Sequence, residues 1–233
     1  MNADRGARLR QAVLVARELG PVSEHLRSVL GLGEPFADPG VGAFGLHNAV
    51  YAIGDTFLEV VSPTRPDTTA GRYLDRRGDG GYMVILQLSD LDAARERAAA
   101  MGIRTVWQLD LPDISGTHLH PADTRGAIVS LDRADPPGSW RWGGPDWTER
   151  EGTGAPGQLR GVTIAVNDPA ETAARWGELL GIEPYGEAVV LDGSFVRFEP
   201  GDQERLTDLH LEVPGKHEIV EIGGATFRLT PPD

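Results

Sequence analysis

Three stretches of this chain share one pattern, and that repetition constrains the fold more than any single residue does. Each stretch has an apolar strand, an acidic residue, a short amphipathic helix and a stop that contains glycine. They read AVLVARELGPVSEHLRSVLGL from Ala12, MVILQLSDLDAARERAAAMGI from Met83 and VTIAVNDPAETAARWGELLGI from Val162. A recurrence of this length indicates that one supersecondary unit is repeated along the chain.

The residues after each repeat favour further strands. Residues 46–53 and 56–61 flank Gly54-Asp55, a pair typical of hairpins. A fourth stretch, from Thr207, has strands but no helix. We therefore predict an α+β protein of tandem βαβββ modules in two paired-module domains, with the last module truncated. The predicted parts are a complete pair at 9–135, a connector rich in proline, glycine and tryptophan at 136–157, and a reduced pair at 158–233.

Composition narrows the classes of partner. The 233 residues carry 35 acidic and 22 basic side chains, a net charge of −13, so the chain repels nucleic acid and anionic membranes. Its apolar runs are strand-sized and too short to span a membrane. The first ten residues lack the apolar stretch of a signal peptide, which predicts a cytoplasmic protein. There is no cysteine for a disulfide or a thiolate site.

Strands covered by helices on one side leave the other face to line a concavity, or cup. In the strand Phe57-Leu58-Glu59-Val60-Val61, alternation puts Glu59 on the cup face with Phe57 and Val61. An unpaired buried carboxylate costs about several kcal/mol. Glu59 should therefore have a partner: a cation, a ligand hydroxyl or an arginine.

Two stretches carry a resemblance to a known family. GLHNAVYAIGDTFLEVVSP from Gly45 and THLHPADTRGAIVSLD from Thr117, with the repeated modules, resemble the glyoxalase/bleomycin-resistance/dioxygenase group, the vicinal oxygen chelate superfamily. The stretch from Gly45 is most similar to the glyoxalase-like domain branch. The resemblance implies that two modules form a cup around one divalent metal. In catalytic members that metal stabilises an anionic intermediate as a Lewis acid.

The metal positions that the resemblance implies here are Gln11, Glu59, Met83 and Ser130. Gln11 and Glu59 are acceptable oxygen donors, whereas the thioether of Met83 and the hydroxyl of Ser130 are poor ligands for such ions. We therefore predict no metal at the family position and no bound cofactor.

The histidines leave alternatives open. His118 and His120 are two residues apart, a spacing that could complete a displaced metal site with Glu59 or place a general base. His120 could equally shape the loop before Pro121. His47 and Asn48 lie on opposite faces of their strand, so at most one faces the cup, and a structural hydrogen bond is the competing interpretation.

Two functions follow. The first is a protein that binds a small organic ligand in its N-terminal cup, without a metal. The second is an isomerase or lyase that acts next to a carbonyl, with Glu59 or His120 as base, or with a divalent metal held by Glu59 and His118 or His120. The candidate ligand contacts are Gln11, His47, Asn48, Phe57, Met83, Ile85, His118 and Ser130. An apolar strand face without its helix, around Leu209 and Leu211, makes a homodimer possible.

Overall fold

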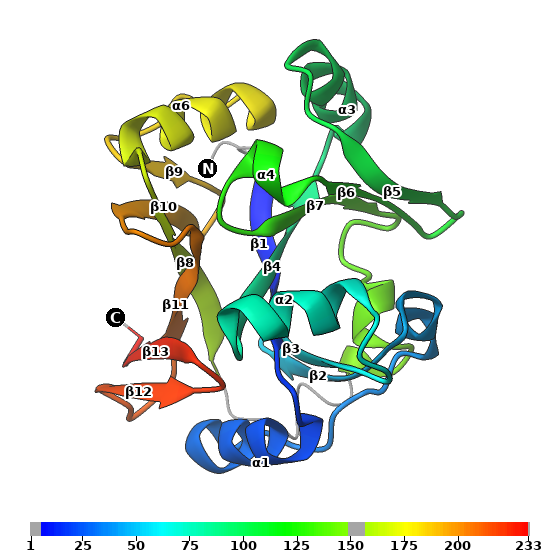
Figure 1. The fold of residues 1–233 in the computed structure, drawn as a ribbon, viewed down its shortest axis with the longest axis vertical. Helices are drawn as coiled ribbons and strands as arrows, with labels where there is room; N and C mark the ends of the chain where they lie inside the picture. The colour runs from blue at the N-terminus through cyan, green and yellow to red at the C-terminus, as the bar shows by residue number, and fades with distance from the viewer. Residues whose placement is uncertain (1–5, 149–156, 233) are drawn as a thin grey trace. The chain divides into compact units, whose positions relative to one another are not determined.

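The computed structural model describes residues 6–148 and 157–232, and it contains the four expected modules in chain order (Figure 1). The first comprises β1 (Ala7–Val15), α1 (Leu19–Leu30), β2 (Leu46–Ile53) and β3 (Thr56–Pro63). The second comprises β4 (Gly80–Leu88), α3 (Leu91–Ala100), β5 (Thr105–Asp110), β6 (Ile114–Leu119) and β7 (Ile128–Ala134). The third comprises β8 (Gln158–Val166), α6 (Pro169–Leu180), β9 (Ala188–Val190) and β10 (Phe195–Pro200). The fourth has β11 (Arg205–Glu212), β12 (Glu218–Ile222) and β13 (Ala225–Thr230), with no helix among its described residues.

The strands form two sheets. The seven-stranded sheet has the order β2-β3-β1-β4-β7-β6-β5, and the six-stranded sheet has the order β12-β13-β11-β8-β10-β9. In each sheet the first strands of two modules are neighbours, β1 with β4 and β8 with β11. The α+β architecture of paired modules is therefore confirmed.

In the described part of the chain, only the second module has all four strands of the βαβββ pattern. In the first module the missing strand is reduced to a single antiparallel bridge between Phe36 and Val50. In the third it is reduced to a bridge between Tyr185 and Ala188. The glycine- and proline-rich loop at 33–42 explains the first reduction, because such residues do not sustain a strand.

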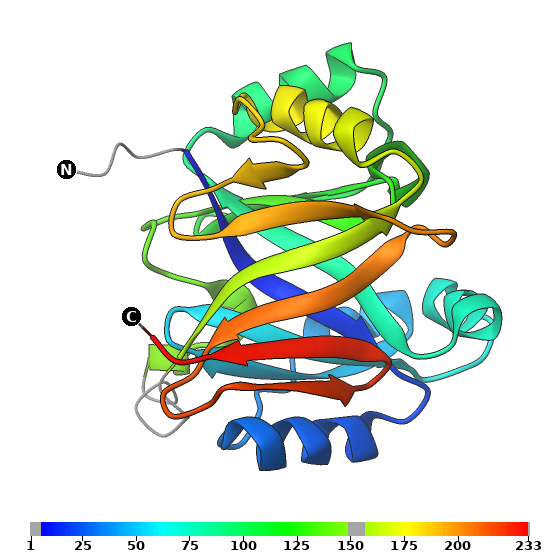
Figure 2. The ribbon, with the colours of Figure 1, turned by 90° about the vertical axis from the view of Figure 1, so that its left-hand side faces the viewer.

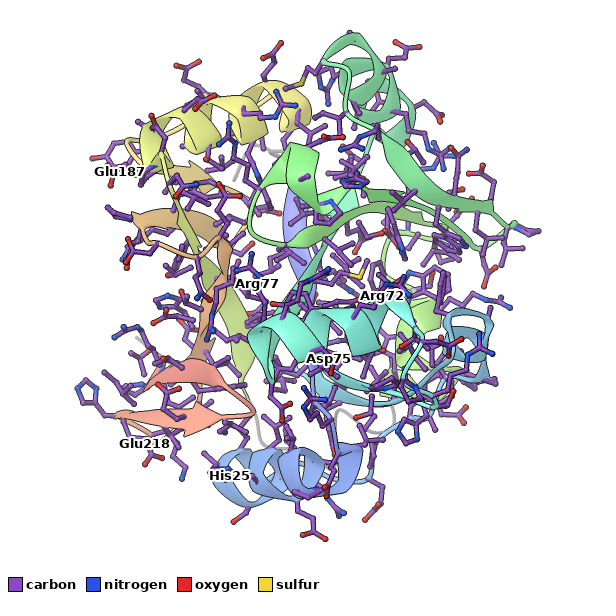
Figure 3. The ribbon with its side chains drawn as sticks, viewed as in Figure 1. His25, Arg72, Asp75, Arg77, Glu187 and Glu218 are labelled. Carbon is purple, nitrogen blue, oxygen red and sulfur yellow. The ribbon has the colours of Figure 1, made fainter. Side chains whose placement is uncertain are left out.

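Short helices connect these elements: η1 (Pro39–Phe44), α2 (Thr69–Arg77), α4 (Pro121–Thr124) and η2 (Arg141–Gly143). The sequence analysis did not predict α2. The hydroxyl of Thr68 caps it by accepting the Gly71 N–H at 2.9 Å. Figure 3 labels three charged residues along α2, Arg72, Asp75 and Arg77.

Contacts divide the chain into two compact units. The first holds residues 1–10, 83–140 and 160–207, and the second holds 11–82, 141–159 and 208–233. The boundaries fall inside β1, β4, β8 and β11. The first unit thus contains most of the second and third modules, and the second unit contains most of the first and fourth. The predicted division into domains at residues 135 and 158 stays a prediction. Each compact unit combines separate stretches of the chain, so the units do not test it.

In the first unit, α6 packs on β9 and β10, and Figure 2 shows this helix beside these two strands. Trp176 on α6 is fully buried, lies edge-on to Phe198, and donates its indole N–H to the Thr124 carbonyl at 2.7 Å. The Arg97 guanidinium on α3 donates to the Leu179 carbonyl on α6 at 2.8 Å. These contacts hold the second and third modules of this unit together.

In the second unit, α1 packs on β2, β3 and β12. The strand face around Leu209 and Leu211, which lacks a helix of its own module, is buried within the single chain. This face therefore needs no second subunit to cover it. The homodimer stays a prediction, and the strand face around Leu209 and Leu211 no longer argues for it. In the described residues, no helix combines the length and the apolar character that crossing a membrane would require.

The repeated acidic residue caps two of the three helices. The side chains of Asp90 and Asp168 accept N–H groups of the first turns of α3 and α6, at 3.0 and 2.9 Å. Glu18, at the same place before α1, makes no such bond. The shorter aspartate suits the cap, because its carboxylate lies closer to its own backbone.

We expect Asp168→Ala to lower the free energy of unfolding by about 1 kcal/mol, because the helix loses its cap. Glu18→Ala is the matched control and should change it little. Urea unfolding of the three proteins measures the difference. Equal losses in both variants would contradict the assigned cap.

Candidate functional site

Glu59, in the middle of β3, is a buried carboxylate held by two amides. Its Oε2 accepts the Gln11 Nε2–H at 2.7 Å, and its Oε1 accepts the Asn48 Nδ2–H at 2.6 Å. The side chain is 7% exposed. The carboxylate thus has two neutral amides from β1 and β2 as partners, and not the cation, ligand hydroxyl or arginine that the sequence analysis expected.

Strand register explains why these three side chains meet. Gln11 pairs with Phe57 and Val13 with Glu59 across the parallel β1–β3 ladder. Asn48 pairs with Val61 across the antiparallel β2–β3 ladder. Paired residues share a face and faces alternate along a strand, so the three polar groups lie on one side of the sheet.

The orientation of Asn48 is set by the loop before it. Its Oδ1 accepts the Asp38 N–H at 2.9 Å, so its NH₂ group must face Glu59. Asp38 in turn caps η1 by accepting the Gly40 N–H at 2.8 Å. The glycine-rich loop therefore fixes the amide that holds the carboxylate.

Burial raises the pKa of Glu59 to about 7, although the hydrogen bonds from Asn48 and Gln11 lower it. Desolvation outweighs the two amides because neither carries a positive charge. Glu59 is thus a carboxyl group that gains and loses its proton near neutral pH.

Aromatic residues lie beside the carboxylate. Phe57 is buried and contacts Trp147 edge-to-face, with ring centroids 5.4 Å apart. Gly143 of the connector approaches the same ring so closely that an added Cβ would lie 2.4 Å from Phe57 Cε1. Gly143 and Trp147 of the connector therefore pack on Phe57. The face around Glu59 therefore combines one titratable group with apolar rings.

The second module carries the other candidates, in the first compact unit. Ile85 pairs with Ser130 across β4 and β7, and His118 pairs with Ser130 across β6 and β7. Met83 lies two residues before Ile85 and shares its face. The structure thus places Met83, Ile85, His118 and Ser130 on one face of this sheet. Their convergence with Glu59 stays a prediction.

Sequence reasoning missed Asp132. It lies two residues after Ser130 on the same face of β7 and is buried. Its carboxylate accepts a hydrogen bond from the Ser130 hydroxyl. The signal was available, because alternation along β7 places residues 130 and 132 together. Ser130 is therefore a partner of a buried carboxylate.

The two histidines lie in different surroundings. The His118 ring lies 4.4 Å from the Trp107 ring, and burial lowers its pKa to about 4. His120 caps α4: its Nδ1 accepts the Ala122 N–H at 3.2 Å and lies 3.2 Å from Arg104 Nη2. Because both neighbours are donors, Nδ1 carries no proton. His120 thus caps the turn that begins at Pro121. This agrees with the alternative interpretation, in which His120 shapes that loop.

His47 does not join this face. It pairs with Ser62, on the side of β2 opposite Asn48, and its side chain is exposed. Of the pair His47-Asn48, the residue on the Glu59 side is Asn48.

The donors do not fit the divalent metal that the resemblance implies. Both oxygens of Glu59 accept amide N–H groups, and Gln11 presents its NH₂ group to that carboxylate. Ser130 donates to Asp132. Among the residues that the structure describes, no three His, Asp or Glu side chains cluster in a way that could hold a metal.

Some solved structures resemble almost the whole chain, and others resemble about half of it. A hypothetical protein from Staphylococcus aureus matches 97% of this chain and 99% of its own length, with a TM-score of 0.67 and 12% identity. The methylmalonyl-CoA epimerase of Streptomyces coelicolor, in complex with 2-nitronate-propionyl-CoA, matches 55% of this chain and 98% of its own, with a TM-score of 0.49 and 22% identity. The corresponding Mycobacterium tuberculosis epimerase matches 54% and 87%, with a TM-score of 0.48 and 21% identity.

The first of these shows that the tandem fold exists as a whole in another protein. Among curated protein sequences, none matches this chain. The family model for the glyoxalase-like domain matches residues 12–180. That match covers more than half of the residues, and the chain therefore belongs to the glyoxalase-like domain family.

Proposed function

We propose that the N-terminal pair of modules binds a small organic ligand at Glu59, without the metal of the superfamily. The observation that carries this proposal is the buried carboxylate held by Gln11 and Asn48 on a face with Phe57 and Trp147. A mostly apolar surface with few oriented polar groups is the usual composition of a small-molecule site.

The ligand should carry a hydrogen-bond donor. Each carboxylate oxygen has two lone pairs, and each Glu59 oxygen receives one amide N–H, so the group can accept further hydrogen bonds. A ligand hydroxyl or N–H would meet this need, and an aromatic or aliphatic body would pack on Phe57 and Trp147.

A second candidate function is proton transfer next to a carbonyl, with Glu59 as the base. The pKa of about 7 favours it, because a general base works best when its pKa lies near the working pH. His120 is excluded from this role in our proposal, since its Nδ1 accepts the Ala122 N–H at the start of α4.

Native mass spectrometry of the protein purified from its own host should show a bound small molecule. We expect Glu59→Gln to lose most of that ligand, because its amide nitrogen cannot accept the ligand's donor. Glu199→Gln, on an exposed position of β10, is the matched control and should retain it. Full retention by Glu59→Gln would contradict the proposed site.

The same pair of variants separates binding from catalysis once the ligand is known. A binding protein with Glu59→Gln should lose affinity by roughly tenfold, as expected for one hydrogen bond to a charged group. A proton-transfer enzyme should lose turnover by about 100-fold or more while it still binds substrate. Exchange of the ligand's carbon-bound hydrogen with D₂O, followed by NMR, measures the second activity.

Glu59 should also make stability depend on pH. Its folded pKa of about 7 lies above its ordinary 4.5, so the folded protein holds the proton more tightly. This contribution is complete below pH 4.5 and is lost as the pH rises through 7. Relative to Glu59→Gln, we expect the free energy of unfolding to fall by roughly 3 kcal/mol over this window. Urea unfolding at a series of pH values checks this, and parallel curves would contradict it.

Metal removal tests the absence of a chelating centre. We expect elemental analysis of the purified protein to find no stoichiometric divalent ion, and EDTA to leave ligand binding unchanged. A stoichiometric ion that is lost together with binding would overturn the metal-free site.

A further inference from the structure

The strands at the ends of the two sheets are β2, β5, β9 and β12, and an edge strand leaves backbone N–H and C=O groups open to further pairing. Three of these edges are covered, interrupted or short. β2 is covered by the bridge between Phe36 and Val50, with two backbone hydrogen bonds of 2.8 Å. β5 has a bulge between Thr105 and Trp107, and β9 has only three residues. Such features protect natural sheets from pairing edge to edge.

The fourth edge, β12, lacks these features in the described part of the chain. Its five residues pair in unbroken register with β13, and Figure 1 shows it at the end of its sheet, next to β13. α1 contacts the turn after the strand, where a Cβ added to Gly223 would lie 2.8 Å from Val22 Cγ1. Glu218, Ile219 and Glu221 nevertheless stay exposed, and Ile219 is 65% exposed. β12 is therefore an open edge with a large apolar side chain near its centre.

Charged residues can also protect an edge, but those of β12 suit a second copy of the same strand. Alternation places His217, directly before the strand, on the same face as Ile219 and Glu221. In an antiparallel pair of β12 strands centred on Ile219, each Ile219 would meet the partner's Ile219. Each Glu221 would meet the partner's His217, because the two positions lie equally far from the centre. Such pairs stabilise a sheet, whereas like charges placed opposite each other destabilise it.

The contact between Glu221 and a second copy's His217 needs no rearrangement within the chain. Glu221 accepts the Thr226 hydroxyl at 2.5 Å, and a carboxylate has lone pairs for further donors. His217 is exposed, and an imidazole ring has an N–H to donate in either protonation state. Registers centred on Glu218 or Val220 would instead set Ile219 opposite His217 or Glu221. The register centred on Ile219 therefore matches apolar with apolar and donor with carboxylate.

We propose that β12 pairs antiparallel with the β12 of a second copy, which makes the chain a homodimer. The backbone groups on the open side of each strand would bond across the new ladder, and the two Ile219 side chains would leave water together. The arrangement has two-fold symmetry, so two copies complete it. This surface is separate from the function proposed for Glu59 and does not depend on it.

Size-exclusion chromatography with light scattering, over a dilution series of the full chain, tests the proposal. We expect a particle of twice the 25.0 kDa mass of the chain at the higher concentrations. Ile219→Lys sets two ammonium groups opposite each other and should raise the dissociation constant of the dimer at least about tenfold. Val106→Lys, on the edge strand β5 at a position 52% exposed, is the matched control and should leave it unchanged. A monomer at every concentration up to about 1 mM, or equal effects of the two variants, would overturn the proposal.

A single cysteine locates the interface, because the chain has none of its own. Residues directly opposite each other in an antiparallel pair have Cα atoms roughly 4.5–5.5 Å apart, a separation that a disulfide can bridge. Ile219→Cys should therefore give a disulfide-linked dimer on mild oxidation, and Val106→Cys should not. His217→Glu should weaken the dimer, and adding Glu221→His should restore it, because the exchanged pair is again complementary. A dimer that Ile219→Cys does not cross-link, or that the double variant does not restore, would contradict this pairing.

Discussion

The hydrogen bonds from Gln11 and Asn48 to the buried Glu59 carboxylate are the interaction on which the proposed site depends. Each such bond to a charged group contributes about 1.5–3 kcal/mol, while removing the carboxylate from water costs several kcal/mol. The raised pKa of Glu59 shows that desolvation exceeds the support from the amides. The Glu59 carboxyl group is thus poised between a charged and a neutral form.

The side chains at the metal positions that the resemblance implies have other partners in this chain. In the superfamily pattern, residues at positions 11 and 59 would face a cation. Here the Gln11 amide turns its NH₂ group to Glu59, so that the two residues satisfy each other. Ser130 likewise pairs with Asp132. Each of these hydrogen bonds joins two residues of one compact unit.

The repeated modules differ because each meets different neighbours. The second keeps four strands, while the first and third retain only single bridges at Phe36 and Tyr185. The loop that replaces the missing strand of the first module gains a role of its own, since Asp38 orients Asn48. The fourth module has no helix in the described residues, yet Leu209 and Leu211 are buried because other parts of the chain cover them. Loss of a local element is therefore tolerated wherever tertiary packing supplies a substitute.

The sequence by itself determined the modules, the position of nearly every strand and three of the helices, and the strand face that Glu59 shares with Phe57. These features follow from alternation, helical spacing and turn residues, which are local and repeated three times. It could not identify the partners of Glu59, since Gln11 and Asn48 lie 48 and 11 residues away and only strand register brings them together. The capping role of His120 and the pairing of Ser130 with Asp132 were decided by tertiary structure for the same reason. A side chain's face can be read from its neighbours in sequence, but its partner depends on which strand lies beside it.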